Sequence, residues 1–172
     1  VGGADIFYDV IDAGLALNFN SPQNNSLYDL NDTVEWDIST SQQADITMYI
    51  NGVEESAAND VTSLTGDYVL SSVGGYWFKV VVEADTTIMD SAYVVAKAAT
   101  ETEALPSDVT KGINYHEGDT SVTLVLETPV ANKEYAFVVG DFTNWFIDNN
   151  YQMKQTPDGK YFWLYIGNLT PQ

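Results

Sequence analysis

Cysteine and arginine are absent from this chain of 172 residues, and His116 is its only histidine. Without cysteine, no disulfide can stabilise the fold, and no thiolate can bind a metal or attack a substrate. A single histidine also leaves too few ligands for a transition-metal site. Asp5, Asp9 and Asp12 are close in sequence, but their spacing does not match a calcium-binding loop. We therefore expect no cofactor and no metal site.

Basic residues are scarce as well, since the chain has six lysines against 25 acidic residues and a net charge of −19. Binding to nucleic acid or to an anionic membrane surface requires a basic face, so we expect neither partner. No apolar run approaches the ~20 residues that span a bilayer, which argues against membrane insertion. The acidic surplus favours solubility outside the cell and does not repel a neutral ligand.

Candidate catalytic groups are also few. An excess of acidic residues raises the question of catalysis by a pair of carboxylates, as in glycoside hydrolysis. That reaction needs two carboxylates facing each other across a cleft, one of them with a raised pKa. Acidic residues such as Glu35 and Asp37 instead alternate with apolar residues, which is typical of the solvent face of a strand. His116 lies in a polar loop without a nucleophile motif, as a surface histidine would. We predict no catalytic residue.

The chain does contain many short segments in which apolar and polar residues alternate, and no convincing helical period. In the N-terminal part these segments lie near residue 17 and at 34–38, 46–50, 76–82 and 91–97. Asn51-Gly52 predicts a tight hairpin turn. This spacing is typical of an Ig-like sandwich, in which Trp36 would be the buried tryptophan. The same alternation predicts that Trp77 points outward, onto a contact surface or under a neighbouring segment.

An acidic, polar stretch at 101–108 lacks alternation and contains Pro106, so we interpret it as a linker. It separates an Ig-like or fibronectin-like sandwich at 1–100 from a second β-domain at 109–172. The second domain has alternating segments at 112–115, 122–126, 135–139 and 160–166. Four strands are few for a closed sandwich, so we expect this domain to be incomplete in the chain. The predicted fold class is all-β, with two tandem β-sandwiches of Ig-like or E-set type.

The most informative stretch follows the segment at 135–139 and reads Gly140-Asp141-Phe142-Thr143-Asn144-Trp145. A glycine and polar residues predict a tight loop that carries one large aromatic ring. A flat indole next to amide and carboxylate groups suits a sugar, because the ring stacks on the pyranose and the polar groups bind hydroxyls. The alternative is that Trp145 closes the end of the sandwich. Phe146 and Tyr151 flank the loop, either as packing for it or as further stacking surface.

This stretch resembles carbohydrate-binding module family 48, the β-sandwich that precedes the catalytic barrel of glycoside hydrolase family 13 enzymes. The matching pattern continues through Met153-Lys154, Pro157-Asp158-Gly159 and an aromatic strand to Gly167-Asn168-Leu169-Thr170-Pro171. Gly112-Ile113-Asn114-Tyr115 is similar to the lead-in of such modules in bacterial amylases. The resemblance implies that Trp145 stacks on glucose. It also implies that the face with Tyr161, Trp163 and Tyr165 is the inner one.

From this resemblance we expect a non-catalytic, N-terminal region of a bacterial α-amylase-family enzyme that acts on starch, secreted or anchored at the outer surface. Its partners would be α-1,4-glucan or maltooligosaccharides and its own downstream catalytic domain. Trp145 and Asn144 would contact the glucan, with Phe146 and Tyr151 as candidate further contacts. Two alternatives remain open, namely a surface starch-binding lipoprotein without a catalytic domain and a purely structural spacer.

Overall fold

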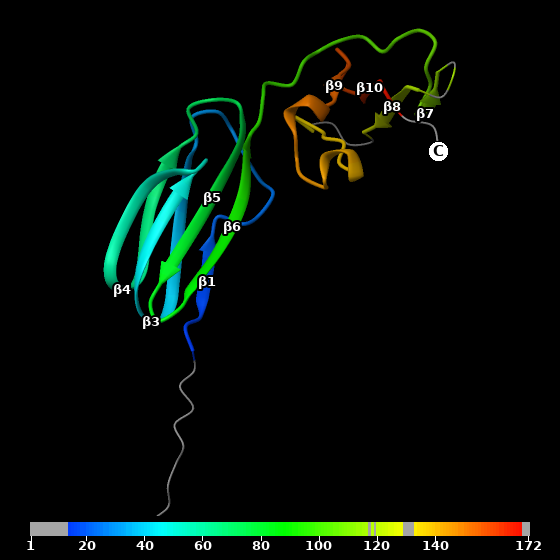
Figure 1. Ribbon diagram of the computed structural model, residues 1–172. Coiled ribbons are helices and arrows are strands. Elements are labelled where there is room, and N and C mark those ends of the chain that lie inside the picture. The colour runs from blue at the N-terminus through cyan, green and yellow to red at the C-terminus, as the bar shows by residue number, and fades with distance from the viewer. Residues whose placement is uncertain (1–13, 117, 119, 129–132, 170–172) are drawn as a thin grey trace, which may run out of the picture. The chain divides into compact units, whose positions relative to one another are not determined.

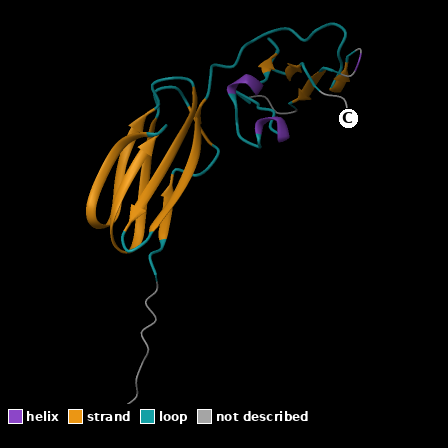
Figure 2. Ribbon diagram, viewed as in Figure 1, coloured by secondary structure: helices purple, strands orange, loops and turns teal. Residues whose placement is uncertain are grey.

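The computed structural model describes residues 14–116, 118, 120–128 and 133–169. These residues form ten strands in two sheets, and they contain no α-helix. Figure 1 shows the strands, and the short helices drawn purple in Figure 2 are 3-10 helices. The predicted all-β fold class is therefore confirmed. Contacts group the chain into a first unit of residues up to Asn24, Val34–Tyr68 and Trp77–Ala92, and a second unit of Asn25–Thr33, Val69–Tyr76 and Tyr93–Gln172.

The first sheet contains six strands in the order β1-β3-β5-β6-β2, with β4 paired to β3. Their bounds are β1 Leu17–Ser21, β2 Ser26–Tyr28, β3 Thr33–Ile50, β4 Val53–Val69, β5 Gly74–Glu83 and β6 Thr87–Ala96. Strands β1 and β5 run antiparallel to β3, whereas β2 runs parallel to β6. The predicted turn at Asn51-Gly52 joins β3 to β4, and both residues have the positive φ that such a turn requires.

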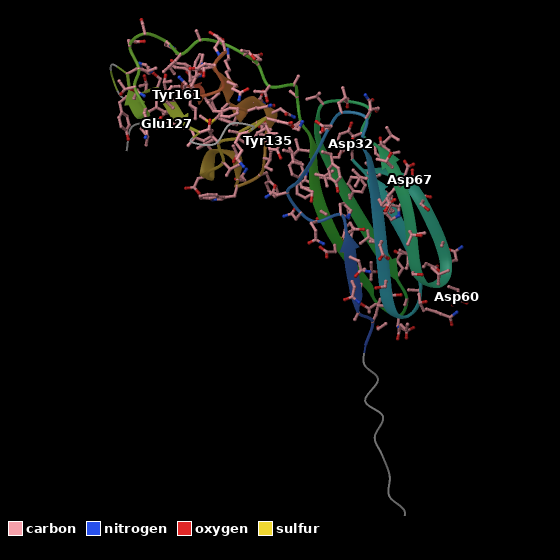
Figure 3. The ribbon with its side chains drawn as sticks, turned by 180° about the vertical axis from the view of Figure 1, so that it is seen from behind. Asp32, Asp60, Asp67, Glu127, Tyr135 and Tyr161 are labelled. Carbon is pink, nitrogen blue, oxygen red and sulfur yellow. The ribbon has the colours of Figure 1, made fainter. Side chains whose placement is uncertain are left out.

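The core of the first unit follows the predicted alternation. Every second residue of β3 is buried at both of its ends, and the buried residues of β5 pair with them, as in Met48 opposite Val80. Trp36 is 3% exposed, as predicted, and its ring lies 6.4 Å from that of Phe78. Many outward positions are polar, and on β4 the exposed Asp60 and Asp67 carry their carboxylates on the surface (Figure 3).

For the first sheet, one expectation is wrong and one strand was missed. The segments at 34–38 and 46–50 are not separate strands, because β3 runs unbroken through both of them. No glycine or proline interrupts the polar residues between them, and pairing continues from Thr40 opposite Leu17 on β1 to Asp45 opposite Glu83 on β5. Strand β4 was not predicted, since its residues are mostly small or polar and give little apolar signal.

The second sheet has four strands in the order β7-β8-β10-β9, namely β7 Gly112–Tyr115, β8 Val122–Glu127, β9 Lys154–Gln155 and β10 Tyr161–Ile166. Strand β10 pairs with β8 along its whole length, from Tyr161 opposite Glu127, both labelled in Figure 3, to Ile166 opposite Val122. The segment at 135–139 is not a strand. Only Phe137 forms a bridge, with Gln152, because this segment pairs with a turn rather than with a strand.

The inner face of β10 differs from the one that the resemblance implied. Phe162, Leu164 and Ile166 are buried in one cluster with Val122 and Met153. Trp163 is buried on the opposite face with Val109, Val125 and Leu105, whereas Tyr165 is 56% exposed. The prediction that Tyr161, Trp163 and Tyr165 form the inner face is therefore wrong. Trp163 is covered because residues of the predicted linker lie over it, and its Nε1 donates to the Glu103 carbonyl at 3.1 Å.

The predicted linker is thus hydrogen-bonded to the second sheet, since Thr102 bridges Gln155 and the Glu103 N–H donates to the Gln155 carbonyl at 2.9 Å. The domain boundaries and the incompleteness of the second domain stay predictions.

At β7, the second sheet is poorly covered. Ile113 and Tyr115 pair with Leu124 and Val122 on the core face, yet they are 61% and 68% exposed.

Candidate functional site

The loop that carries Trp145 is organised around Gly140 and Thr143. The short 3-10 helix η2, Asp141–Thr143, follows Gly140. The Gly140 carbonyl accepts from the N–H of Thr143 at 2.9 Å and from that of Trp145 at 3.0 Å. The Thr143 hydroxyl, which is buried, accepts from the Gly140 N–H at 3.1 Å and donates to its carbonyl at 3.0 Å. These bonds close the loop into a compact turn.

Asn144 and Trp145 both adopt left-handed backbone conformations, with φ of 50° and 63°. Asparagine tolerates this region, whereas a bulky residue such as tryptophan rarely enters it. Such a conformation persists only where surrounding contacts hold it in place. With the backbone in this conformation, Trp145 is 63% exposed.

The indole is also fixed in orientation, because its Nε1 donates to the Asp141 carboxylate at 2.9 Å. The polar edge of the ring is therefore occupied within the protein, and the flat apolar part is left to the solvent. Asp141 and Asn144 are exposed beside it. An exposed flat ring with a carboxylate and an amide in the same loop can stack on a sugar ring and bind its hydroxyls.

Phe142, which was not among the residues predicted to contact a ligand, is a second exposed ring of this loop and is 48% exposed. It packs against Tyr151 with 4.9 Å between the ring centroids. A Cβ at Gly140 would lie 2.8 Å from Cε1 of the Phe142 ring, so the ring would have to shift if residue 140 carried a side chain. The signal was present in the sequence, since Phe142 stands between polar residues of a loop where no core face requires it.

Phe146 and Tyr151 are half-buried and make ring contacts within the protein. Phe146 meets the edge of Tyr93, with centroids 5.0 Å apart, and Tyr151 packs on the core of the second sheet. Tyr151 belongs to the 3-10 helix η3, Asn149–Tyr151, which Asp148 caps by accepting from the Asn150 N–H. Burial and the nearby Asp148 raise the pKa of the Tyr93 hydroxyl. The two rings thus support the loop, and Phe142 and Trp145 are its two exposed aromatic rings.

The other candidate groups do not join this loop. The ring of His116 is half-buried and its Nε2 lies 2.8 Å from the Thr123 hydroxyl. Trp77, on the first sheet, is 43% exposed, and its backbone N–H donates to the Asn51 side chain. Among the residues that the structure describes, no three His, Cys, Asp or Glu side chains form a group able to hold a metal ion. Asp5, Asp9 and Asp12 lie outside the described residues.

Asp158 lies in the turn between β9 and β10 of the second sheet. It is the only acidic residue with a clearly shifted pKa among the groups that the structure describes. The Thr156 hydroxyl donates to its carboxylate at 2.6 Å and the Lys160 N–H does so at 3.1 Å, and these bonds lower its pKa. The carboxylate therefore stabilises the predicted turn at Pro157-Asp158-Gly159, and this geometry serves structure rather than proton transfer.

Within the described ranges, no helix is long and apolar enough to cross a membrane.

Comparisons with known proteins give no functional assignment. No protein-family model matches the chain, and no curated protein matches it. Among solved structures, the chain is similar to a pair of tandem Ig domains of titin, with 13% sequence identity and a TM-score of 0.36. That match covers 90% of this chain and 82% of the titin chain. A similarity this low says nothing about what the chain binds.

Proposed function

We propose that this chain is a non-catalytic glycan-binding region, and that the exposed surface formed by Trp145 and Phe142 docks an α-1,4-glucan. The observation that carries the proposal is the indole of Trp145, which is 63% exposed and yet held by its Nε1 bond to Asp141. A ring that is fixed before binding loses little conformational entropy when a ligand stacks on it.

The polar groups of the loop suit a carbohydrate. The exposed Asp141 carboxylate accepts one bond from Trp145, and an ionised carboxylate has further lone pairs that can accept from sugar hydroxyls. Asn144 adds an amide with both donor and acceptor atoms. A neutral sugar chain approaches a protein of net charge −19 without repulsion, unlike an acidic polysaccharide.

The choice of α-1,4-glucan rests on the resemblance of the segment from Gly140 to Trp145, and of the segments after it, to carbohydrate-binding module family 48. On this basis the chain belongs to the N-terminal part of a secreted or surface-anchored bacterial starch-acting protein. It would hold starch or position a catalytic barrel further along the chain. The aromatic contact is small, so the dissociation constant for a single chain should fall roughly between micromolar and millimolar.

The test is a titration of the chain with maltoheptaose by isothermal calorimetry, with cellohexaose as the linkage control. Trp145→Ala should weaken binding at least tenfold, about 1.4 kcal/mol, because the stacking surface is removed. Trp77→Ala is the matched control, since it removes another exposed indole, on the first sheet, and should leave the affinity unchanged.

Calorimetry avoids a fluorescence signal that would change with the number of tryptophans. A wild-type chain that does not bind maltoheptaose would refute the proposal, as would equal binding by the Trp145→Ala variant. Equal binding of cellohexaose would leave sugar binding in place and refute the preference for α-1,4-glucan.

A further inference from the structure

We propose that Asn25, which is 120 residues from Trp145 in sequence, is the positioning residue of the glucan-binding loop. This inference rests on the proposed function for its effect on affinity, but not for its effect on the loop. Asn25 lies in the second unit with the loop, immediately before β2, and nothing in the sequence pattern connects the two.

The side chain of Asn25 bonds to the loop through both of its polar atoms. Its Nδ2 donates to the Trp145 carbonyl at 3.1 Å, and its Oδ1 accepts from the Ile147 N–H at 3.4 Å. The amide thus spans residues 145–147 in the way that a neighbouring strand would. Only an amide side chain of this length offers a donor and an acceptor together, because aspartate lacks the donor.

Asn25 is itself held in place by the backbone. Its φ is 59°, in the left-handed region that asparagine tolerates, and its N–H donates to the Tyr93 carbonyl at 2.7 Å. The next residue, Ser26, begins β2 and pairs with Val94 on β6. The ring of Tyr93 in turn contacts Phe146, one residue after Trp145. The loop is therefore fixed from outside by a side chain and by a ring of the same unit.

The bonds from Asn25 act where the backbone of the loop is strained. Trp145 has a φ of 63°, which is unfavourable for a bulky residue unless contacts on both sides enforce it. The Gly140 carbonyl accepts from the backbone N–H of Trp145, and the Asp141 carboxylate accepts from its indole Nε1. The Nδ2 of Asn25 donates to the Trp145 carbonyl. Without Asn25, the Trp145 carbonyl and the Ile147 N–H lose their partner, and the backbone can relax out of this conformation. The indole then has to be ordered again when the ligand binds.

The clean perturbation is Asn25→Gly, because glycine adopts a positive φ without strain and removes only the side chain. Asn25→Asp is the second variant, since it keeps the acceptor and the size but loses the donor to Trp145. Asn31→Gly is the matched control, another asparagine of the second unit with a positive φ, 71°, whose N–H bonds to the Leu70 carbonyl. All three variants are checked for folding by their amide NMR spectra.

The first measurement needs no ligand. The side-chain N–H signal of Trp145 is assigned with Trp145→Phe, and its heteronuclear NOE reports how rigid the indole is. Asn25→Gly and Asn25→Asp should lower this NOE, while Asn31→Gly should leave it at the wild-type value. The second measurement is maltoheptaose affinity, which Asn25→Gly should weaken by about threefold to tenfold because the loop must be ordered on binding.

An indole that stays as rigid in the folded Asn25→Gly and Asn25→Asp variants as in the wild type would overturn the positioning role. So would a loss of rigidity of the same size in Asn31→Gly. If the wild type fails to bind maltoheptaose, the proposed function fails, and the NMR measurement still decides whether Asn25 holds the loop.

Discussion

Gly66, on β4, lies against the buried indole of Trp36, and its replacement by alanine tests how tightly the first unit is packed. A Cβ at this position would lie 2.2 Å from Cζ2 of Trp36 and 2.6 Å from its Cε2. Ordinary carbon contacts begin near 3.5 Å. The ring or the strand would have to move by more than 1 Å, and Trp36 is only 3% exposed, with Phe78 packed beside it.

The expected loss of stability follows from this overlap. Overpacking a close-packed core costs about 1–3 kcal/mol, occasionally more. The change from glycine to alanine in a strand recovers part of that cost, about 0.5–1 kcal/mol, by restricting the unfolded chain. We expect a net loss of about 1–2 kcal/mol in the free energy of unfolding. For a unit of this size, each kcal/mol lowers the melting temperature by about 4–8 °C.

The assay is thermal unfolding followed by circular dichroism, with urea unfolding as a second measure of stability. Gly14→Ala is the control, because its Cβ would meet no atom within 4 Å. The double variant Trp36→Phe with Gly66→Ala should cost less than the sum of its parts, since the smaller ring leaves room for the methyl group. If Gly66→Ala unfolds at the wild-type temperature, the close packing of β4 on Trp36 is wrong.

Two further predictions concern the second sheet. Phe162→Ala should lower the free energy of unfolding in urea by about 3–5 kcal/mol, because Phe162 is fully buried. Tyr165→Ala should lower it far less, because Tyr165 is 56% exposed. Equal losses would contradict the assignment of the inner face. Thr156→Val should raise the pKa of Asp158 towards its ordinary value, as measured by carboxyl NMR titration. Because folding lowers this pKa, the carboxylate stabilises the turn at neutral pH, and its contribution is lost as the pH falls through the folded pKa; an unchanged pKa in Thr156→Val would refute the bond.

Prediction from the sequence succeeded where the structure is local. Alternation along 34–38 and 76–82 identified the inward residues, including Trp36, because side chains of a strand point to alternate faces wherever the strand lies. Asn51-Gly52 identified its turn, because few residue pairs adopt two consecutive positive φ values. The loop with Trp145 was also found from its residue types alone, and its ring is exposed.

Prediction failed where pairing partners decide the outcome. The segment at 135–139 alternates like a strand, but the residues opposite it form the turn η3 and offer only one bridge, between Phe137 and Gln152. The face of β10 could not be assigned from alternation, since both faces carry apolar residues. It was decided by Met153 and Val122 covering Phe162, and by Leu105 and Val109 covering Trp163 on the other side.

By itself, the sequence determined the all-β class, the turns, and a loop that carries a large aromatic ring, since these depend on residue type and on neighbours along the chain. Only the tertiary structure decided that this ring is exposed and what holds it. The Asp141 carboxylate is four residues from Trp145, but the amide of Asn25 comes from 120 residues away. A contact over that separation depends on how the strands return through space, which no local pattern encodes.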